Sequence, residues 1–312
     1  MKAVALGAYI LDVLVRPVTE IPPGQDAALV EEIRLAPAGA AGGTAVTLAK
    51  LGAEVHAAGA VGRDKLGDVL IEMLERHGVR TERLARRDEL QTSSSVIPIR
   101  PTGERPALHV IGANMSYTPQ DAPLELIAEA DFLHVGGPEL LGETAQLVLA
   151  AAKEGGATTS VDVLADGWPE LLDMIAPALT HVDWITPNDE QAKRLTGATD
   201  MESAASELLE RGAGGVIVTC GAEGVLIVTA EGQTRVPAFE IDVVDTSGCG
   251  DAFVAGFLRG LSLGDEPPEA ARLGSAAAAL VARGTGSDYG AFDLDAVQAF
   301  AAATPVREPA QG

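Results

Sequence analysis

The sequence is short of several features that mark particular classes of protein. It contains 2 cysteines in 312 residues, Cys220 and Cys249, which excludes a disulfide framework and a cysteine-based metal cluster. It has 22 basic residues against 45 acidic ones, for a net charge of −23, so neither nucleic acid nor an anionic membrane surface is an expected partner. Aromatic residues make up only 4% of the chain. No apolar run is long and clean enough to cross a bilayer.

Apolar residues are plentiful, and their order along the chain indicates the fold class. Hydrophobic residues make up 47% of the sequence, enough for one large α/β domain or two modest ones. Met1–Gly7 is too short an apolar run for a signal peptide and predicts a first strand. With so few cysteines, a reducing cytoplasm is the expected setting. From Phe132 onward strand-like and helix-like segments alternate, which predicts a parallel sheet with crossover helices.

One stretch, Asp245–Asp251, organises the functional interpretation. It has the sequence Asp-Thr-Ser-Gly-Cys-Gly-Asp, and the apolar positions that follow recur at the spacing of one helical face. Gly248 and Gly250 allow a tight turn, and the free N–H groups at a helix start favour an anion. Asp251 at that start suits a base that takes a proton from a hydroxyl while the N–H groups stabilise a neighbouring phosphoryl group. The alternative is an ordinary Asp cap on a buried helix, and for the heptapeptide alone the two interpretations are about even.

This stretch resembles the C-terminal signature of the PfkB, or ribokinase-like, family of carbohydrate kinases, in which Ala usually stands at Cys249. The resemblance implies that Asp251 deprotonates the acceptor hydroxyl and that the amides of Gly248, Cys249 and Gly250 cradle the transferred phosphoryl group. It implies ATP and Mg²⁺ as cofactors. It also implies an α/β, ribokinase-like three-layer sandwich with a central, mostly parallel sheet and a small β lid. The whole of 1–312 would be one such domain, with the lid formed by segments near 13–36 and 90–112.

The N-terminal third carries the expected acceptor site. Asp12 lies among apolar residues and would need a partner. The resemblance implies that it binds sugar hydroxyls, with an Asp in a turn as the alternative. The segment from Ala38 resembles the family's N-terminal Gly-Gly-x-x-x-Asn-x-Ala motif. Gly39 keeps its second Gly, but Ala38 replaces the first Gly and Gly43 replaces the Asn, so the substrate side of the pocket is altered. Gly42 and Gly43 remain candidates for the acceptor site, because glycines let the backbone approach a polyol closely. Close helix packing would also explain these glycines. Asn114 is a further candidate for the pocket, although an Asn in a turn is at least as common.

Periodicity places the elements around this motif. Residues 27–35 alternate as a lid strand would. Val46, Leu48 and Leu51 suit a helix closed by Gly52. Asp64, in a turn that resembles another family motif, is expected to cap a helix rather than to bind a ligand.

The expected nucleotide site follows in the second half. Asn188 matches the family's Pro-Asn-x-x-Glu element, which helps to hold magnesium and phosphates, but Gln191 replaces the Glu. Thr219, Gly221 and Gly224 resemble the family's nucleotide loop, although a strand followed by turn glycines is usually just a hairpin. Asn188 and Thr219, like Asp162, end predicted parallel strands, where ligands collect.

Two further roles come from the resemblance alone. The small-residue helix after the signature would wall the adenine, with Ser275 where an Asn often stands. The loop around Asp245 and Ser247 would share a monovalent-cation site, for K⁺, with the loop that follows that helix.

The predicted function is therefore an ATP-dependent kinase of a sugar or a related small molecule. A nucleoside kinase and a sugar-phosphate kinase are the alternatives within enzymes. A phosphorylated acceptor would need Arg16, Arg100 or Arg105 in the pocket, and a purine nucleoside would favour the aromatic side chains that the chain lacks. A sensor that keeps the fold without catalysis is the alternative from another class; Gln191 and Gly43 favour it and the intact Gly-x-Gly-Asp opposes it. A homodimer is left open.

Overall fold

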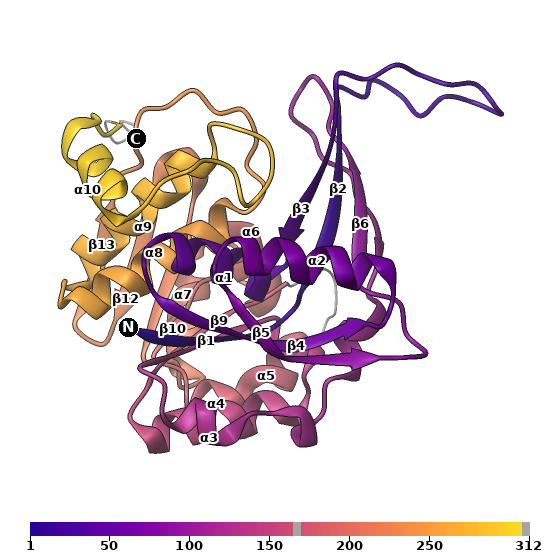
Figure 1. The fold of residues 1–312 in the computed structure, drawn as a ribbon. Coiled ribbons are helices and arrows are strands. Elements are labelled where there is room, and N and C mark those ends of the chain that lie inside the picture. The colour runs from indigo at the N-terminus through magenta and orange to yellow at the C-terminus, as the bar shows by residue number, and fades with distance from the viewer. Residues whose placement is uncertain (165–169, 308–312) are drawn as a thin grey trace.

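The computed structural model describes residues 1–164 and 170–307. Its centre is a nine-stranded sheet in the order β13-β12-β11-β10-β9-β8-β1-β4-β5, which runs through the middle of Figure 1. From β11 to β5 every pairing is parallel, and only β12 and β13 are antiparallel additions at one edge. The predicted parallel sheet is confirmed. Its strands are β1 (Lys2–Gly7), β4 (Glu54–Gly62), β5 (Arg80–Arg87), β8 (Phe132–Gly136), β9 (Thr158–Asp162), β10 (Trp184–Ile185), β11 (Gly215–Thr219), β12 (Val225–Thr229) and β13 (Gly232–Val236).

Helices cover both faces of this sheet and produce a three-layer sandwich. Each face has its own buried apolar cluster, as expected when both sides of a parallel sheet are covered. One cluster lies beneath α1 (Ala40–Lys50), α2 (Lys65–Arg76), α8 (Cys249–Leu263) and α9 (Pro267–Val281). The other lies beneath α3 (Leu124–Ala128), α4 (Glu143–Gly155), α5 (Leu171–Leu179), α6 (Asp189–Thr196) and α7 (Met201–Glu210). A last helix, α10 (Leu294–Ala303), packs on α9.

A second, four-stranded sheet projects from one end of the sandwich (Figure 1). It consists of β3 (Glu32–Ala38), β2 (Ile10–Arg16), β6 (Ser94–Pro98) and β7 (Leu108–Val110), in that order. The predicted strand over 27–35 is wrong at its start, because β3 begins at Glu32. The register explains the shift: β3 pairs with β2 from Ile10↔Ala38 to Arg16↔Glu32, and residues before Glu32 lie beyond the end of β2.

The start of α1 differs from the prediction, whereas the start of α2 agrees with it. Helix α1 begins at Ala40, earlier than the apolar spacing indicates, so Gly42 and Gly43 belong to its first turn. Asp64 caps α2 as predicted, since its side chain accepts a hydrogen bond from Gly67 N at 2.8 Å. In the part of the chain that the structure describes, no helix has the length and apolarity that a membrane span requires.

Candidate active site

The carboxylate of Asp251 lies in the first turn of α8, directly against the first turn of α1. A Cβ atom added at Gly43 would lie 2.1 Å from Asp251 Oδ2, so only glycine leaves room for this carboxylate. Gly248, the residue before α8, has φ 72°, and a Cβ there would lie 2.2 Å from Ser287 Cβ. Glycine is therefore required at both positions, and the two glycines fix where the carboxylate lies.

A second carboxylate, Asp12 on β2, faces the same space as Asp251. Burial and the charge of Asp12 raise the pKa of Asp251 to about 7. Burial likewise raises the pKa of Asp12 to about 6, while a hydrogen bond with Ser95 and the positive charge of Arg105 partly offset this increase. A carboxyl group with a pKa near neutrality is well suited to accept a proton and release it again, as a general base must.

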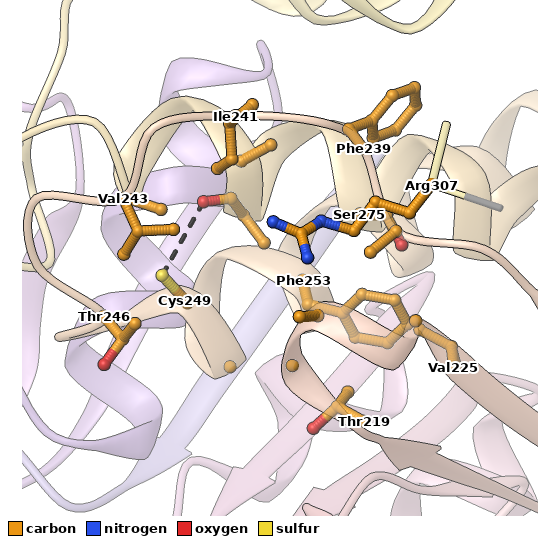
Figure 2. Close-up of a pocket in the computed structure, with 18 residues that line it drawn as sticks. Thr219, Val225, Phe239, Ile241, Val243, Thr246, Cys249, Phe253, Ser275 and Arg307 are labelled. Carbon is orange, nitrogen blue, oxygen red and sulfur yellow. Dashed lines mark hydrogen bonds between the residues drawn. The ribbon is translucent and has the colours of Figure 1, made fainter. Parts of the chain in front are cut away.

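An apolar cavity lies on the other side of the turn that precedes Asp251. Gly250 and Cys249 line it at one end, and Phe239, Ile241 and Phe253 form apolar walls (Figure 2). Four of the five predicted nucleotide residues also line it, namely Thr219, Gly221, Gly224 and Ser275, whereas Asn188 is not among the lining residues. The start of α8 thus contributes Cys249 and Gly250 to the cavity and carries the Asp251 carboxylate at the next residue.

Comparison with known proteins assigns the chain to a family. The model of the pfkB family of carbohydrate kinases matches residues 2–292. The chain belongs to the pfkB family of carbohydrate kinases. It is therefore an enzyme that phosphorylates a hydroxyl group of a sugar or a related small molecule, and the suspected resemblance and enzyme class are confirmed.

Several relatives illustrate the range of this kinase family. Fructokinase-2 of Oryza sativa subsp. japonica is 30% identical over 74% of this chain and 72% of its own length. Aminoimidazole riboside kinase of Salmonella typhimurium is 29% identical over 72% of this chain and 74% of its own length. A solved structure of a candidate ribokinase II of E. coli, in complex with ATP and Mg²⁺, superposes with a TM-score of 0.82 over 96% of this chain and 98% of that one. At 21% identity, that likeness shows the shared fold, as predicted.

Two of the predicted acceptor residues have packing roles in this kinase. Asn114 is 3% exposed, and its amide brackets the backbone of Tyr9: Oδ1 accepts from Tyr9 N at 3.2 Å and Nδ2 donates to Tyr9 O at 3.2 Å. These two bonds give the Asn114 side chain a structural role, and its contact with the acceptor stays a prediction. Gly42 faces the buried ring of Tyr9, which favours the close-packing alternative for this glycine. Gly39, with φ 90°, starts α1 against the carbonyl of Ala8.

Asn188 and Gln191 form a reciprocal cap at the start of α6. Asn188 Oδ1 accepts from Gln191 N, and Gln191 Oε1 accepts from Asn188 N, both at 2.8 Å. Gln191 Nε2 also donates to Val163 O at 2.7 Å, which an ionised Glu could not do. The Glu-to-Gln departure in this kinase therefore serves a local hydrogen bond to the end of the neighbouring strand. Asn188 is exposed at the strand ends, next to Thr219, with which it forms an isolated bridge.

Asp245 and Ser247 join two loops through hydrogen bonds. Asp245 Oδ1 accepts from Ser247 N and Ser247 Oγ, each at 2.9 Å, and Oδ2 accepts from Gly286 N at 3.0 Å. Arg105, from the β6–β7 connection, lies 3.4 Å from Asp245 Oδ1 and donates to Ser247 Oγ at 2.5 Å. Protein donors thus engage both carboxylate oxygens, and the guanidinium group of Arg105 supplies a positive charge beside them. A K⁺ site at these loops stays a prediction.

A magnesium ion fits the kinase only if the nucleotide supplies most of its ligands. Among residues 1–164 and 170–307 no group of three His, Cys, Asp or Glu side chains is placed to hold a metal ion. Mg²⁺ commonly keeps several waters and takes one or two carboxylates together with phosphates. Asp162, at the end of β9, is a buried carboxyl group whose pKa burial and the charge of Asp251 raise well above the usual range, so it would bind Mg²⁺ only by losing its proton to the approaching cation.

Three contributors to the site were missed or undervalued in the sequence. Asp162 was recognisable only as an acidic residue at a strand end. Arg105 was one of three candidate arginines, and nothing in the sequence distinguished it. Arg307, which lines the apolar cavity, lies outside every motif. In the sequence Arg307 is a single basic residue after the last helix, and such residues are too common to indicate a binding site.

Proposed function

We propose that this kinase transfers the γ-phosphoryl group of ATP to a hydroxyl group of an uncharged sugar, with Asp251 as the general base. The observation that carries the proposal is the position of the Asp251 carboxylate. It lies against Gly43 on the acceptor side, one residue after a glycine turn that lines the nucleotide cavity on the other side.

The reaction follows from that position. Asp12 accepts hydrogen bonds from acceptor hydroxyls and orients one of them toward Asp251. Asp251 takes the proton as the acceptor oxygen attacks the phosphoryl group in line. The N–H groups of the Gly248–Gly250 turn stabilise the negative charge on the transferring oxygens. Mg²⁺, held by Asp162 and the nucleotide phosphates, would neutralise further charge when bound.

The arginines favour an uncharged acceptor over a sugar phosphate. Each of the three candidates already has a protein partner. Arg16 Nη1 donates to Thr285 Oγ1 at 2.8 Å, Arg100 donates to the carbonyl of Thr19, and Arg105 pairs with Asp245. An acceptor phosphate would have to compete with these bonds, beside the carboxylates of Asp12 and Asp251. We therefore extend the proposal to neutral polyols, and the scarcity of aromatic side chains disfavours purine nucleosides.

The second sheet supports a further part of the proposal. We infer that it acts as a lid over the acceptor, because Asp12 on β2 and Arg105 between β6 and β7 both face the catalytic loops. Such a cover would exclude water and limit ATP hydrolysis. We also propose a cytoplasmic setting, since both cysteines are free thiols.

The test is ADP release with Mg²⁺-ATP and a panel of neutral sugars, sugar phosphates and nucleosides. We expect a neutral sugar to give the highest turnover. Asp251→Asn should reduce kcat by about 10²- to 10⁴-fold, the usual contribution of a general base, with ATP affinity kept or improved. The matched control is Asp293→Asn, because Asp293 only caps α10 and Asn can replace it as a cap. A panel on which no acceptor raises ADP release would leave the sensor interpretation in place.

A further inference from the structure

One charged side chain enters the apolar part of the nucleotide cavity. Arg307 lines that cavity together with Phe239, Ile241 and Ser275. Figure 2 shows its side chain extending into the cavity from the C-terminal segment, with the guanidinium group in the region of Ile241, Ser275 and Phe253. The expected nucleotide residues did not include it.

The backbone fixes where this arginine lies. Val306 forms an antiparallel bridge with Phe239, Arg307 N donates to Ala238 O at 2.8 Å, and Glu240 N donates to Pro305 O at 2.9 Å. The segment 305–307 is therefore held along the cavity wall at 238–240. These backbone bonds fix the point from which the Arg307 side chain enters the cavity.

The guanidinium group has no protein partner within residues 1–164 and 170–307, since neither a hydrogen bond nor an ion pair involves it. Arg235, which lines the adjoining cleft together with Arg307, differs in this respect because it pairs with Glu202. Arg307 is an exposed residue that also lines the adjoining cleft, so its guanidinium group is hydrated and free to meet a ligand that enters the cavity. The arrangement suits a ligand that offers a flat π surface.

We propose that Arg307 binds the base of the phosphoryl-donor nucleotide, with its planar guanidinium group covering one face of the ring. The inference rests on the proposed function, because it takes this cavity as the nucleotide site. A guanidinium group stacks on aromatic faces, which an ammonium group cannot do in the same way. The apolar wall that includes Phe253 and Ile241 supplies the rest of the enclosure, and the phosphates lie at the Gly248–Gly250 end.

The experiment compares ATP with inorganic tripolyphosphate, which carries the phosphates without the base. Dissociation constants with Mg²⁺ are measured by calorimetry for the wild type, Arg307→Ala, Arg307→Lys and the control Arg235→Ala. We expect Arg307→Ala to weaken ATP binding about tenfold, in keeping with a cation–π contact, and to leave tripolyphosphate binding unchanged. Arg307→Lys should behave like Arg307→Ala, because Lys keeps the positive charge but lacks a planar group that can stack on the base. Arg235→Ala should match the wild type.

Each other outcome overturns the inference. Equal weakening of ATP and tripolyphosphate would make Arg307 a phosphate ligand. Full recovery in Arg307→Lys would leave a role for charge alone. An unchanged ATP constant in Arg307→Ala, when the wild type binds ATP, would overturn this inference and leave the proposed function intact. A wild type without saturable ATP binding would overturn both.

Discussion

The two sides of the active site are built on opposite principles. On the proposed acceptor side, charged side chains from distant segments act on one another: the charge of Arg105 lowers the pKa of Asp12, and the charge of Asp12 raises the pKa of Asp251. On the nucleotide side, the lining is mostly backbone turns and small or apolar side chains, with Arg307 as the exception (Figure 2). The acceptor side therefore depends on the placement and titration of a few groups, whereas the nucleotide side depends on shape.

This difference predicts different sensitivities to mutation. A methyl group added beside a charged catalytic group moves that group, and a displacement of about 1 Å can cost about 100-fold in rate. A small change in an apolar wall is absorbed by the ligand or by neighbouring side chains with a much smaller effect.

The largest effect is expected at Gly43. In Gly43→Ala the new Cβ would lie 2.1 Å from Asp251 Oδ2, so the carboxylate must move. We expect kcat to fall about 100-fold while ATP binding is retained. The matched control is Gly42→Ala, one residue away on the same turn of α1, where the new Cβ would lie an ordinary 3.4 Å from the Tyr9 ring. If both variants keep wild-type turnover, Asp251 does not need its observed position and the comparison fails on the acceptor side.

An intermediate effect is expected in the pH dependence. The pKa of Asp251 is raised to about 7, so the reactive carboxylate is lost as the pH falls, and kcat/KM should decrease about tenfold per unit below pH 7. Asp12→Asn removes a negative charge that contributes to this shift, so the lower inflection of the kcat/KM profile should move to more acidic pH. The acceptor KM should rise as well, because Asp12 is proposed to bind hydroxyls. An inflection that stays in place in Asp12→Asn would show that the two carboxylates do not face each other during the reaction.

The fold was predictable where the chain carries local patterns. The alternation of strands and helices after Phe132 gave the parallel sheet, and Asp64 was recognised as a cap from its turn. Boundaries were less predictable where tertiary pairing decides them. The start of β3 is set by the length of β2, and α1 begins early because its glycines pack against Tyr9 and Asp251. Helix propensity alone disfavours glycine at such positions.

The part of the site that lies within one continuous segment was predictable. The glycine turn with Asp251 is a single motif, so its role could be proposed from seven residues. The contact between Gly43 and Asp251 could not, because the two residues come from helices far apart in the chain. The hydrogen bonds between Asn114 and the backbone of Tyr9 could not be predicted for the same reason, since they join residues far apart in the chain. The bond from Gly286 N to the carboxylate of Asp245 joins two loops that are likewise far apart in the chain.

The smallest effect is expected at Cys249, on the nucleotide side of the same turn as Asp251. Its thiol lines the cavity and lies 3.7 Å from Ala278 O, a weak contact (Figure 2). Burial raises the pKa of this thiol to about 12, so little thiolate forms near neutral pH. We therefore expect Cys249→Ala to keep kcat and the KM for ATP within about twofold, in the range of a tolerated apolar change. A loss approaching that of Gly43→Ala would mean that the side chain at 249, and not only the backbone of the turn, positions the phosphoryl group, and the contrast between the two sides would not hold.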